Sequence, residues 1–224
     1  MEIKGVESGL VTCPVVYGLE ESLVASGFPM LAEYNGDSFK AGVNAIRRGG
    51  CQMHSGRAQK LAGCPMGTGH DNFMCGIVVQ FNLTAPRYLW HEVQRYHFMD
   101  IVSCTSTMHM LMKTLEKCMI SGDHDVVMDR LCSKMSKSMP REVLDGFYAY
   151  AKSVMESSSL DDRDKLLKLK LALPEGWMQT GRITTNYRQL KTVYAQRRNH
   201  RLPEWREFCG WIETLPMSCL MVQK

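Results

Sequence analysis

Features that would indicate a membrane, secreted or DNA-coating protein are scarce in this sequence. Its apolar runs, such as residues 76–79, fall well short of the roughly 18 residues needed to span a bilayer. The 27 basic residues are nearly balanced by 23 acidic ones, which leaves a net charge of only +4. We also expect no signal peptide at the start of the chain. The sequence therefore predicts a soluble, cytoplasmic protein with no membrane partner, and the charge argues against nucleic acid as a partner.

Paired cysteine motifs are also missing. Nine cysteines, an odd number, are scattered without a CxxC pair, which favours reduced thiols over a disulfide framework. One group has the ligand types that zinc prefers, but its spacing matches no common zinc finger. It consists of Cys51, His54, Cys64, His70 and Cys75. We interpret these as ordinary side chains of a Gly-rich loop and predict no metal site.

The composition is that of one globular domain, with 45% hydrophobic and 22% charged residues over 224 positions. No linker, repeat or low-complexity segment divides the chain, so we expect a single domain over residues 1–224. Residues 77–83 alternate apolar and polar side chains, which predicts a half-buried strand. We expect irregular structure in residues 1–35 and 49–76, where Gly and Pro are frequent.

Helical patterns dominate the rest and predict an α+β protein. Thr84 is a candidate cap for a helix over residues 86–99. Residues 106–119 carry Met108 and Leu111 at helical spacing, which we interpret as core packing. Four more helices are expected over residues 38–48, 123–137, 141–156 and 161–173.

The C-terminal third places polar residues at both ends of an apolar stripe. Thr185 is a candidate cap for a helix over residues 186–198, and helical spacing aligns Asn186 and Arg197 with Leu190 and Val193. An inward guanidinium needs an anionic partner. An internal carboxylate and a ligand phosphate both satisfy this requirement, and the residues alone do not choose between them.

The basic run at residues 197–201 precedes Pro203, which starts a final amphipathic helix. By itself such a run is a weak hint of nucleic-acid binding. A solvated helix end explains it better, because cations favour the C-terminal end of a helix dipole.

In a first block of the sequence, the strand over residues 77–83 leads through Ala85-Pro86 and a helix into Arg95-Tyr96-His97. This order resembles the Ala-Pro, helix and Arg-His-Arg of the flavin-dependent thymidylate synthases. Gly69-His70 matches a Gly-His pair that precedes the family strand. The order and separation of these pieces agree with the family pattern.

The second block is stronger. Leu173-Pro174 stands twelve residues before Asn186, and residues 186–190 are similar to the family's Asn-Ala-Arg-Ser-Leu. Arg197 takes the place of the following arginine, with Trp205 near the next tryptophan. The two blocks cover about half of the chain.

The resemblance implies an antiparallel sheet flanked by helices, a homotetramer with sites between subunits, and the methylation of dUMP or a related pyrimidine nucleotide. FAD would be the cofactor, with methylenetetrahydrofolate and NADPH as co-substrates. The implied cofactor contacts are Arg95, His97, Asn186, Arg188, His70 and Arg201. The implied substrate contacts are Ser103, Thr105, Ser106, Lys170 and Arg197.

The first block departs from the family pattern. Residues 98–109 lack the Asn-Glu pair and the last arginine, and a one-residue insertion places Ser106 at the family's second serine. Ser103, Thr105 and Ser106 form a hydroxyl cluster that suits a phosphate, while Thr105 or Ser106 also suits a helix cap. Lys170 stands where the family has an arginine, so it keeps the charge and loses the bidentate fork.

The implied chemistry is carried by the flavin, so no side chain has to act as a nucleophile. Cys104 lies inside the first block, but no neighbour is placed to activate it, and we interpret it as an ordinary buried thiol. Two functional hypotheses follow. One is an active flavoenzyme, and the other is a binding protein that kept the fold and lost the reaction.

Overall fold

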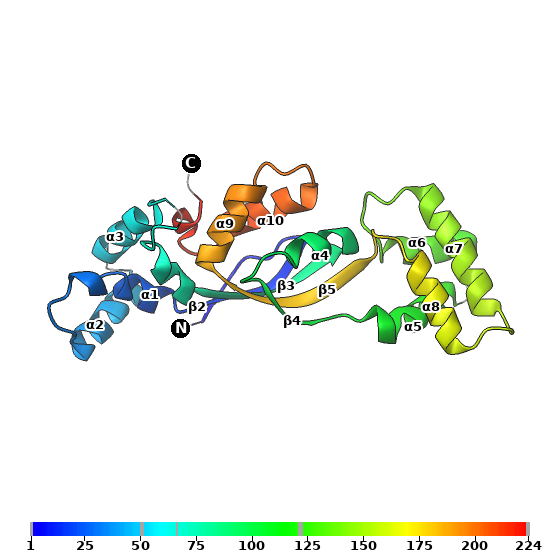
Figure 1. Ribbon diagram of the computed structural model, residues 1–224, viewed down its shortest axis with the longest axis horizontal. Coiled ribbons are helices and arrows are strands. Elements are labelled where there is room, and N and C mark those ends of the chain that lie inside the picture. Colours follow the sequence, from blue (N-terminus) through cyan, green and yellow to red (C-terminus); the bar gives the residue numbers. More distant parts are fainter. Residues whose placement is uncertain (1, 50–51, 66, 121–122, 223–224) are drawn as a thin grey trace. The chain divides into compact units, whose positions relative to one another are not determined.

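The computed structural model describes residues 2–49, 52–65, 67–120 and 123–222. They form two compact units (Figure 1). The first unit comprises Met1–Leu83, Tyr96–Val102 and Arg182–Lys224, and the second comprises Thr84–Arg95 and Ser103–Gly181. The single domain expected from the sequence stays a prediction. Among the described residues, no helix combines the length and the apolar character that crossing a membrane requires.

A five-stranded sheet with the order β1-β2-β3-β5-β4 confirms the predicted α+β class. The strands are β1 (Glu2–Lys4), β2 (Val11–Tyr17), β3 (Val78–Pro86), β4 (Asp100–Cys104) and β5 (Met178–Asn186). β2 pairs antiparallel with both β1 and β3. The sequence predicted only β3, which begins one residue later and ends three residues later than expected. Thr84 belongs to this strand and shares a hydrogen bond of 2.8 Å with Thr180, so its predicted role as a helix cap was wrong.

The core of the first unit lies between β3 and the C-terminal helices α9 (Tyr187–Arg197) and α10 (Pro203–Glu213). Phe81 is fully buried, with its ring centroid 4.7 Å from that of Trp211 and 5.6 Å from that of Phe208. Pro203 occupies the first turn of α10, as the sequence predicted, because its missing N–H is not needed there. The alternation of apolar residues in β3 thus becomes one buried face.

The N-terminal part of the first unit is more helical than expected. Its elements are α1 (Leu19–Ala25), η1 (Phe28–Met30), α2 (Gly36–Arg47), α3 (Gln52–Ala62), η2 (Asn72–Gly76) and, from the C-terminal end, η3 (Ser218–Leu220). The sequence predicted only α2. Apart from α3, the others have seven residues or fewer, so packing stabilises them where local propensity does not. Leu23 of α1, for example, is 1% exposed.

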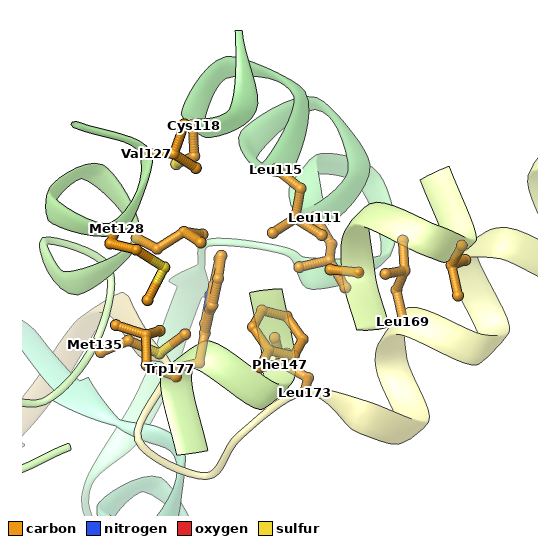
Figure 2. Packing of buried hydrophobic residues seen from close by; sticks show 14 residues of the cluster. Leu111, Leu115, Cys118, Val127, Met128, Met135, Phe147, Leu169, Leu173 and Trp177 are labelled. Atoms are coloured by element: carbon orange, nitrogen blue, oxygen red, sulfur yellow. The ribbon is translucent and has the colours of Figure 1, made fainter. Parts of the chain in front are cut away.

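The second unit is a helical cluster, drawn in green to yellow in Figure 1. Its helices are α4 (Arg87–Val93), α5 (Thr107–Met119), α6 (His124–Cys132), α7 (Arg141–Glu156) and α8 (Asp162–Ala172). Figure 2 shows Trp177 and Phe147 near the centre of its core, with Leu111 and Leu115 of α5 and Leu169 of α8. The predicted helices after residue 105 are therefore confirmed, except that α6 ends early, at Cys132.

For this part of the chain one expectation was wrong and another is confirmed only in part. The helix predicted over residues 86–99 ends at Val93, because the chain then turns toward β4 and buries Met99. Met108 is 54% exposed, so the methionine stripe of α5 is only partly core, and the buried positions belong to Leu111 and Leu115.

Candidate functional site

The junction of β5 and α9 is the frame of the candidate site. Asn186 has an extended backbone, and its side-chain oxygen accepts a hydrogen bond of 2.9 Å from the N–H of Gln189, which caps α9. The sequence assigned this cap to Thr185, and that was wrong, because the Thr185 hydroxyl donates to the carbonyl of Phe98 at 2.6 Å. The next residue, Tyr187, is fully buried, and burial raises the pKa of its phenol, which donates to the carbonyl of Pro216. The start of α9 is therefore tied to two other segments, at Phe98 and Pro216.

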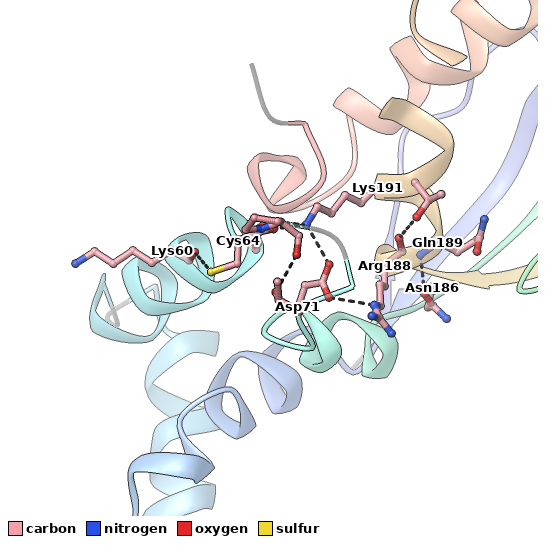
Figure 3. A network of polar contacts seen from close by, with 11 residues as sticks. Lys60, Cys64, Asp71, Asn186, Arg188, Gln189 and Lys191 are labelled. Atoms are coloured by element: carbon pink, nitrogen blue, oxygen red, sulfur yellow. Dashed lines mark hydrogen bonds and ion pairs between the residues drawn. The ribbon is translucent and has the colours of Figure 1, made fainter. Parts of the chain in front are cut away.

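A buried carboxylate, Asp71, joins this helix to the loop before β3 (Figure 3). Its Oδ1 accepts from Nε of Arg188 and its Oδ2 from Nζ of Lys191, each at 3.0 Å. Lys191 also donates to the carbonyl of Ala62 at 2.7 Å. Asp71 is 2% exposed and Lys191 5%, so this cation and anion are removed from water together, while Arg188 stays partly exposed beside them. The guanidinium of Arg188 is thereby held in one orientation.

Sequence reasoning missed both Asp71 and Lys191. Asp71 directly follows the Gly69-His70 pair, so the resemblance pointed to the correct loop but to the neighbouring residue. Lys191 follows the apolar Leu190 and looked like an ordinary solvated lysine, because only the tertiary fold brings Asp71 to it.

Arg188 and Asn186 border a cavity of about 390 Å³ within the first unit. Asp71, Cys75 and Phe98 also line it. Phe98 is 63% exposed, and the Arg188 side chain is 36% exposed. Among the described residues, the terminal nitrogens of Arg188 donate no hydrogen bond. An exposed ring beside available guanidinium donors suits a planar ligand that carries oxygen acceptors.

Arg197 lies at the other end of α9 in an aromatic setting. Its Nε donates to the hydroxyl of Tyr96 at 2.8 Å, and its Nη1 is 2.8 Å from Nε2 of His200. Its guanidinium lies 4.9 Å from the ring centroid of Trp205 and 5.7 Å from that of Tyr96. These contacts orient Arg197 by hydrogen bonds and cation–π attraction.

The apolar stripe predicted for α9 is confirmed in its middle and modified at its ends. Leu190 and Val193 are fully buried, whereas Asn186 and Arg197 are only half-buried. The helix ends extend beyond the core that its middle covers, so polar side chains there keep access to solvent. The ends of the stripe can therefore meet a ligand without the full cost of burial.

No family model matches the sequence, and no curated protein matches it. Many solved structures match its fold, and two of them are of the same protein. One is flavin-dependent thymidylate synthase ThyX from Helicobacter pylori complexed with FAD and dUMP, with a TM-score of 0.68, 16% identity, and coverage of 95% of this chain and 97% of that chain. The chain has the fold of a flavin-dependent thymidylate synthase. The other is also ThyX from H. pylori with FAD and dUMP, with a TM-score of 0.68, 15% identity, and coverage of 94% and 98%.

The fold expected from the flavin-dependent thymidylate synthase resemblance is thus confirmed, and at this identity the likeness shows the fold alone. Within the first unit, the structure brings Asn186 and Arg188 to one cavity. His70, His97 and Arg201 are exposed, and none of them is among the described residues that line this cavity. The backbone carbonyl of Arg201 accepts from Arg206 at 2.9 Å.

The remaining residues singled out by the flavin-dependent thymidylate synthase pattern belong to the second unit. Thr105 and Ser106 serve local structure, since Thr105 Oγ1 accepts from the N–H of Thr180 at 3.1 Å and Ser106 caps α5 through the N–H of His109 at 3.3 Å. Arg95 and Ser103 are exposed. Lys170 is half-buried in the last turn of α8. The helix-cap interpretation of Ser106 is confirmed, and a phosphate contact stays a prediction.

The thiols and histidines form no metal centre among the described residues, where no three side chains of His, Cys, Asp or Glu gather closely enough to hold an ion. Cys51 of the group considered from the sequence lies outside the described residues. Cys104 is exposed, so its interpretation as a buried thiol was wrong. It stands in β4, at the sheet edge, where one strand neighbour covers less of it than a core position would.

Proposed function

We propose that this chain binds FAD and dUMP and methylates dUMP, or a related pyrimidine nucleotide, with methylenetetrahydrofolate as the one-carbon donor and NADPH as the reductant. The observation that supports this most is the cavity lined by Asn186 and Arg188 in a fold whose solved examples hold FAD and dUMP. A homotetramer in the cytoplasm belongs to the same proposal.

The residues of the cavity fit a flavin. The terminal nitrogens of Arg188 are directed by the Asp71 contact and suit the oxygen acceptors of a flavin or pyrimidine edge. Phe98 offers an exposed ring for a planar partner, and Asn186 keeps its amide N–H group beside the cavity while its oxygen caps α9. Bound FAD would supply the electron transfer. The chain's own residues would bind, orient and exclude water.

In this proposal the nucleotide is held by charge and hydroxyl groups. Arg197 is presented by Tyr96 and Trp205, which suits it to the pyrimidine or phosphate of dUMP. Lys170 contributes charge to a phosphate, and Ser103, Thr105 and Ser106 contribute hydroxyls. His70, His97, Arg95 and Arg201 complete the proposed cofactor contacts, and their exposure leaves them available for a ligand.

One observation favours a second candidate function, a protein that binds the nucleotide and flavin without catalysis. The segment over residues 98–109 lacks the Asn-Glu pair and the arginine of the family motif, and several of its side chains are exposed. Binding through Arg188 and Arg197 does not require that segment to be intact. The two candidates therefore predict the same binding and different turnover.

The deciding experiment is a visible absorption spectrum of the full chain incubated with FAD and separated from free flavin, recorded with and without dUMP. We expect a retained flavin spectrum that shifts when dUMP is added. Formation of dTMP after adding methylenetetrahydrofolate and NADPH supports the enzyme, and its absence with binding intact supports the non-catalytic protein. A folded chain that retains no FAD and no dUMP contradicts both. Arg163→Ala, an exposed substitution in α8 away from the proposed contacts, is the control variant and should give the wild-type flavin spectrum and the wild-type response to dUMP.

A further inference from the structure

A second cavity lies among α1, η1, α2 and α3 of the first unit. Its volume is about 280 Å³, close to the lower limit of roughly 300 Å³ for small-molecule sites. It shares no lining residue with the cavity of Asn186 and Arg188. The proposed function therefore makes no use of it.

One wall of this cavity is aromatic. The ring centroid of Phe28 lies 5.7 Å from those of both Tyr34 and Phe39. Despite these contacts, Phe28 is 41% exposed, Leu31 53% and Tyr34 67%. Large apolar side chains gathered around a hollow and left in contact with water mark a binding surface. Ring edges at this spacing leave ring faces available for another planar group.

The polar end of the cavity is the guanidinium of Arg57 in α3. Its Nε donates to Ser26 Oγ at 3.2 Å, and its Nη2 donates to the carbonyl of Leu23 at 3.3 Å. Nη2 also lies 2.9 Å from Nδ1 of His54. Among the described residues, no carboxylate lies within ion-pair distance of Arg57, and its Nη1 has no acceptor. The Arg57 guanidinium is thus held in place by neutral groups, and its Nη1 keeps two N–H donors for an anion.

The backbone at Gly27 leaves the space that the Arg57 guanidinium occupies. A Cβ atom added at Gly27 would lie 2.6 Å from Cζ of Arg57, so only glycine leaves room for the guanidinium against this turn. Gly27 has an ordinary negative φ, which means that space, and no special backbone angle, requires glycine here. Burial, with Arg57 beside it, lowers the pKa of His54, which keeps that ring neutral and able to accept from Arg57.

We propose that this cavity is a binding site for a small aromatic carboxylate, with the ring against Phe28 and Tyr34 and the carboxylate on Arg57. A planar guanidinium with two free donors matches a carboxylate, and a fixed donor set loses little entropy on binding. Glu33 lines the exposed rim and disfavours a second negative charge, so the ligand carries only one. Binding at this site does not depend on the proposed flavin chemistry.

Isothermal titration of the full chain with 2-naphthoate tests the site, and 2-naphthamide serves as the neutral control of the same shape. We expect naphthoate to bind at least about tenfold more tightly, because only the anion gains the charged contact with Arg57. Equal binding of the two probes, or binding of neither, overturns the proposal. Displacement of naphthoate by dUMP would also overturn it, because the site would then belong to nucleotide binding.

Three variants locate the binding. Arg57→Gln should weaken naphthoate about tenfold and leave naphthamide unchanged. Tyr34→Ala should weaken both probes, and because Tyr34 is largely exposed this variant stays folded even if Arg57→Gln does not. The exposed Arg163→Gln in α8 is the matched control and should bind as wild type. Naphthoate binding that survives Arg57→Gln and Tyr34→Ala unchanged places the probe elsewhere and overturns the proposal.

Discussion

The two blocks that carry the family resemblance differ in how the fold uses them. In the second block, residues 186–197 form α9 and its cap. The middle of this helix is buried in the core, and the buried Asp71 pairs with Arg188 and Lys191 in its first turns. Residues 95–109 include exposed side chains at Arg95, His97 and Ser103. In the second block Asn186 and Arg188 make structural contacts and also line the cavity, whereas in the first block Arg95, His97 and Ser103 are exposed and serve no core packing.

This difference explains where the motif is intact and where it is degenerate. A change at Asn186 removes a helix cap, and a change at Arg188 disturbs an ion pair, so stability alone resists both. An exposed position such as His97 has no such second constraint. Stability therefore accounts for Asn186 and Arg188 without catalysis, and binding through Arg188 does not depend on the exposed residues of the other block.

The largest effect is expected at Asp71. Asp71→Ala leaves the buried Lys191 and the partly buried Arg188 without their shared anion, which should cost about 3–5 kcal/mol in the free energy of unfolding measured with urea. The control Asp37→Ala removes an exposed ion pair, in which the Asp37 side chain is 95% exposed and that of Lys40 is 77% exposed. This variant should lower the free energy of unfolding by less than about 1 kcal/mol. Similar losses in the two variants would show that the buried contacts of Asp71 with Arg188 and Lys191 stabilise the fold no more than an exposed ion pair does.

Sequence patterns predicted the elements that have strong periodicity or clear caps. The helices α5, α7 and α8 were found because Ser106 and Asp161 cap two of them and their apolar residues recur at helical spacing. The strand β5 was missed, because residues 178–186 contain Gly181 and only two apolar side chains, Met178 and Ile183, which give no alternating pattern. Pairing with its neighbours in the sheet makes this segment a strand.

The candidate site shows the same limit. Helical spacing placed Asn186 and Arg197 on one stripe with Leu190, which the structure confirms for the buried middle. No local pattern joins Asp71 to Lys191, since they are 120 positions apart and meet only through the tertiary fold. A pattern of side-chain spacing predicts what one helix presents, and it carries no information on the loop that pairs with it.

The second prediction compares two cysteines from these regions. Burial, with Glu213 nearby, raises the pKa of Cys209 in α10 to about 11, so only about one thiol in a thousand is a thiolate at pH 8. Cys104 in β4 is exposed. Iodoacetamide at pH 8 should therefore label Cys104 at least about a hundredfold faster, as followed by peptide mass spectrometry. In urea the two rates should converge, and similar rates in the folded chain would contradict the burial difference.

The third prediction concerns Arg188 under the proposed function. Arg188→Ala removes a charged contact to the flavin and should weaken FAD about 10- to 100-fold, which flavin fluorescence on titration measures. The fold should persist, because Asp71 keeps its contact with Lys191 and no apolar core is cut. Wild-type FAD affinity in the folded variant would refute the assignment of Arg188.

The smallest effect is expected at Ser106, where the cap and the phosphate contact make different predictions. Ser106→Ala removes the acceptor for the N–H of His109 and should cost about 1 kcal/mol in the free energy of unfolding, while Ser106→Asp restores an acceptor and should recover most of it. If Ser106 also contacts the dUMP phosphate, the aspartate variant should regain stability but bind dUMP less well than the alanine variant, because its charge repels the phosphate. A pure cap predicts that dUMP affinity is the same in all three proteins. Urea unfolding and dUMP titration of the same samples separate the two roles, and this comparison decides whether the degenerate block still serves a ligand.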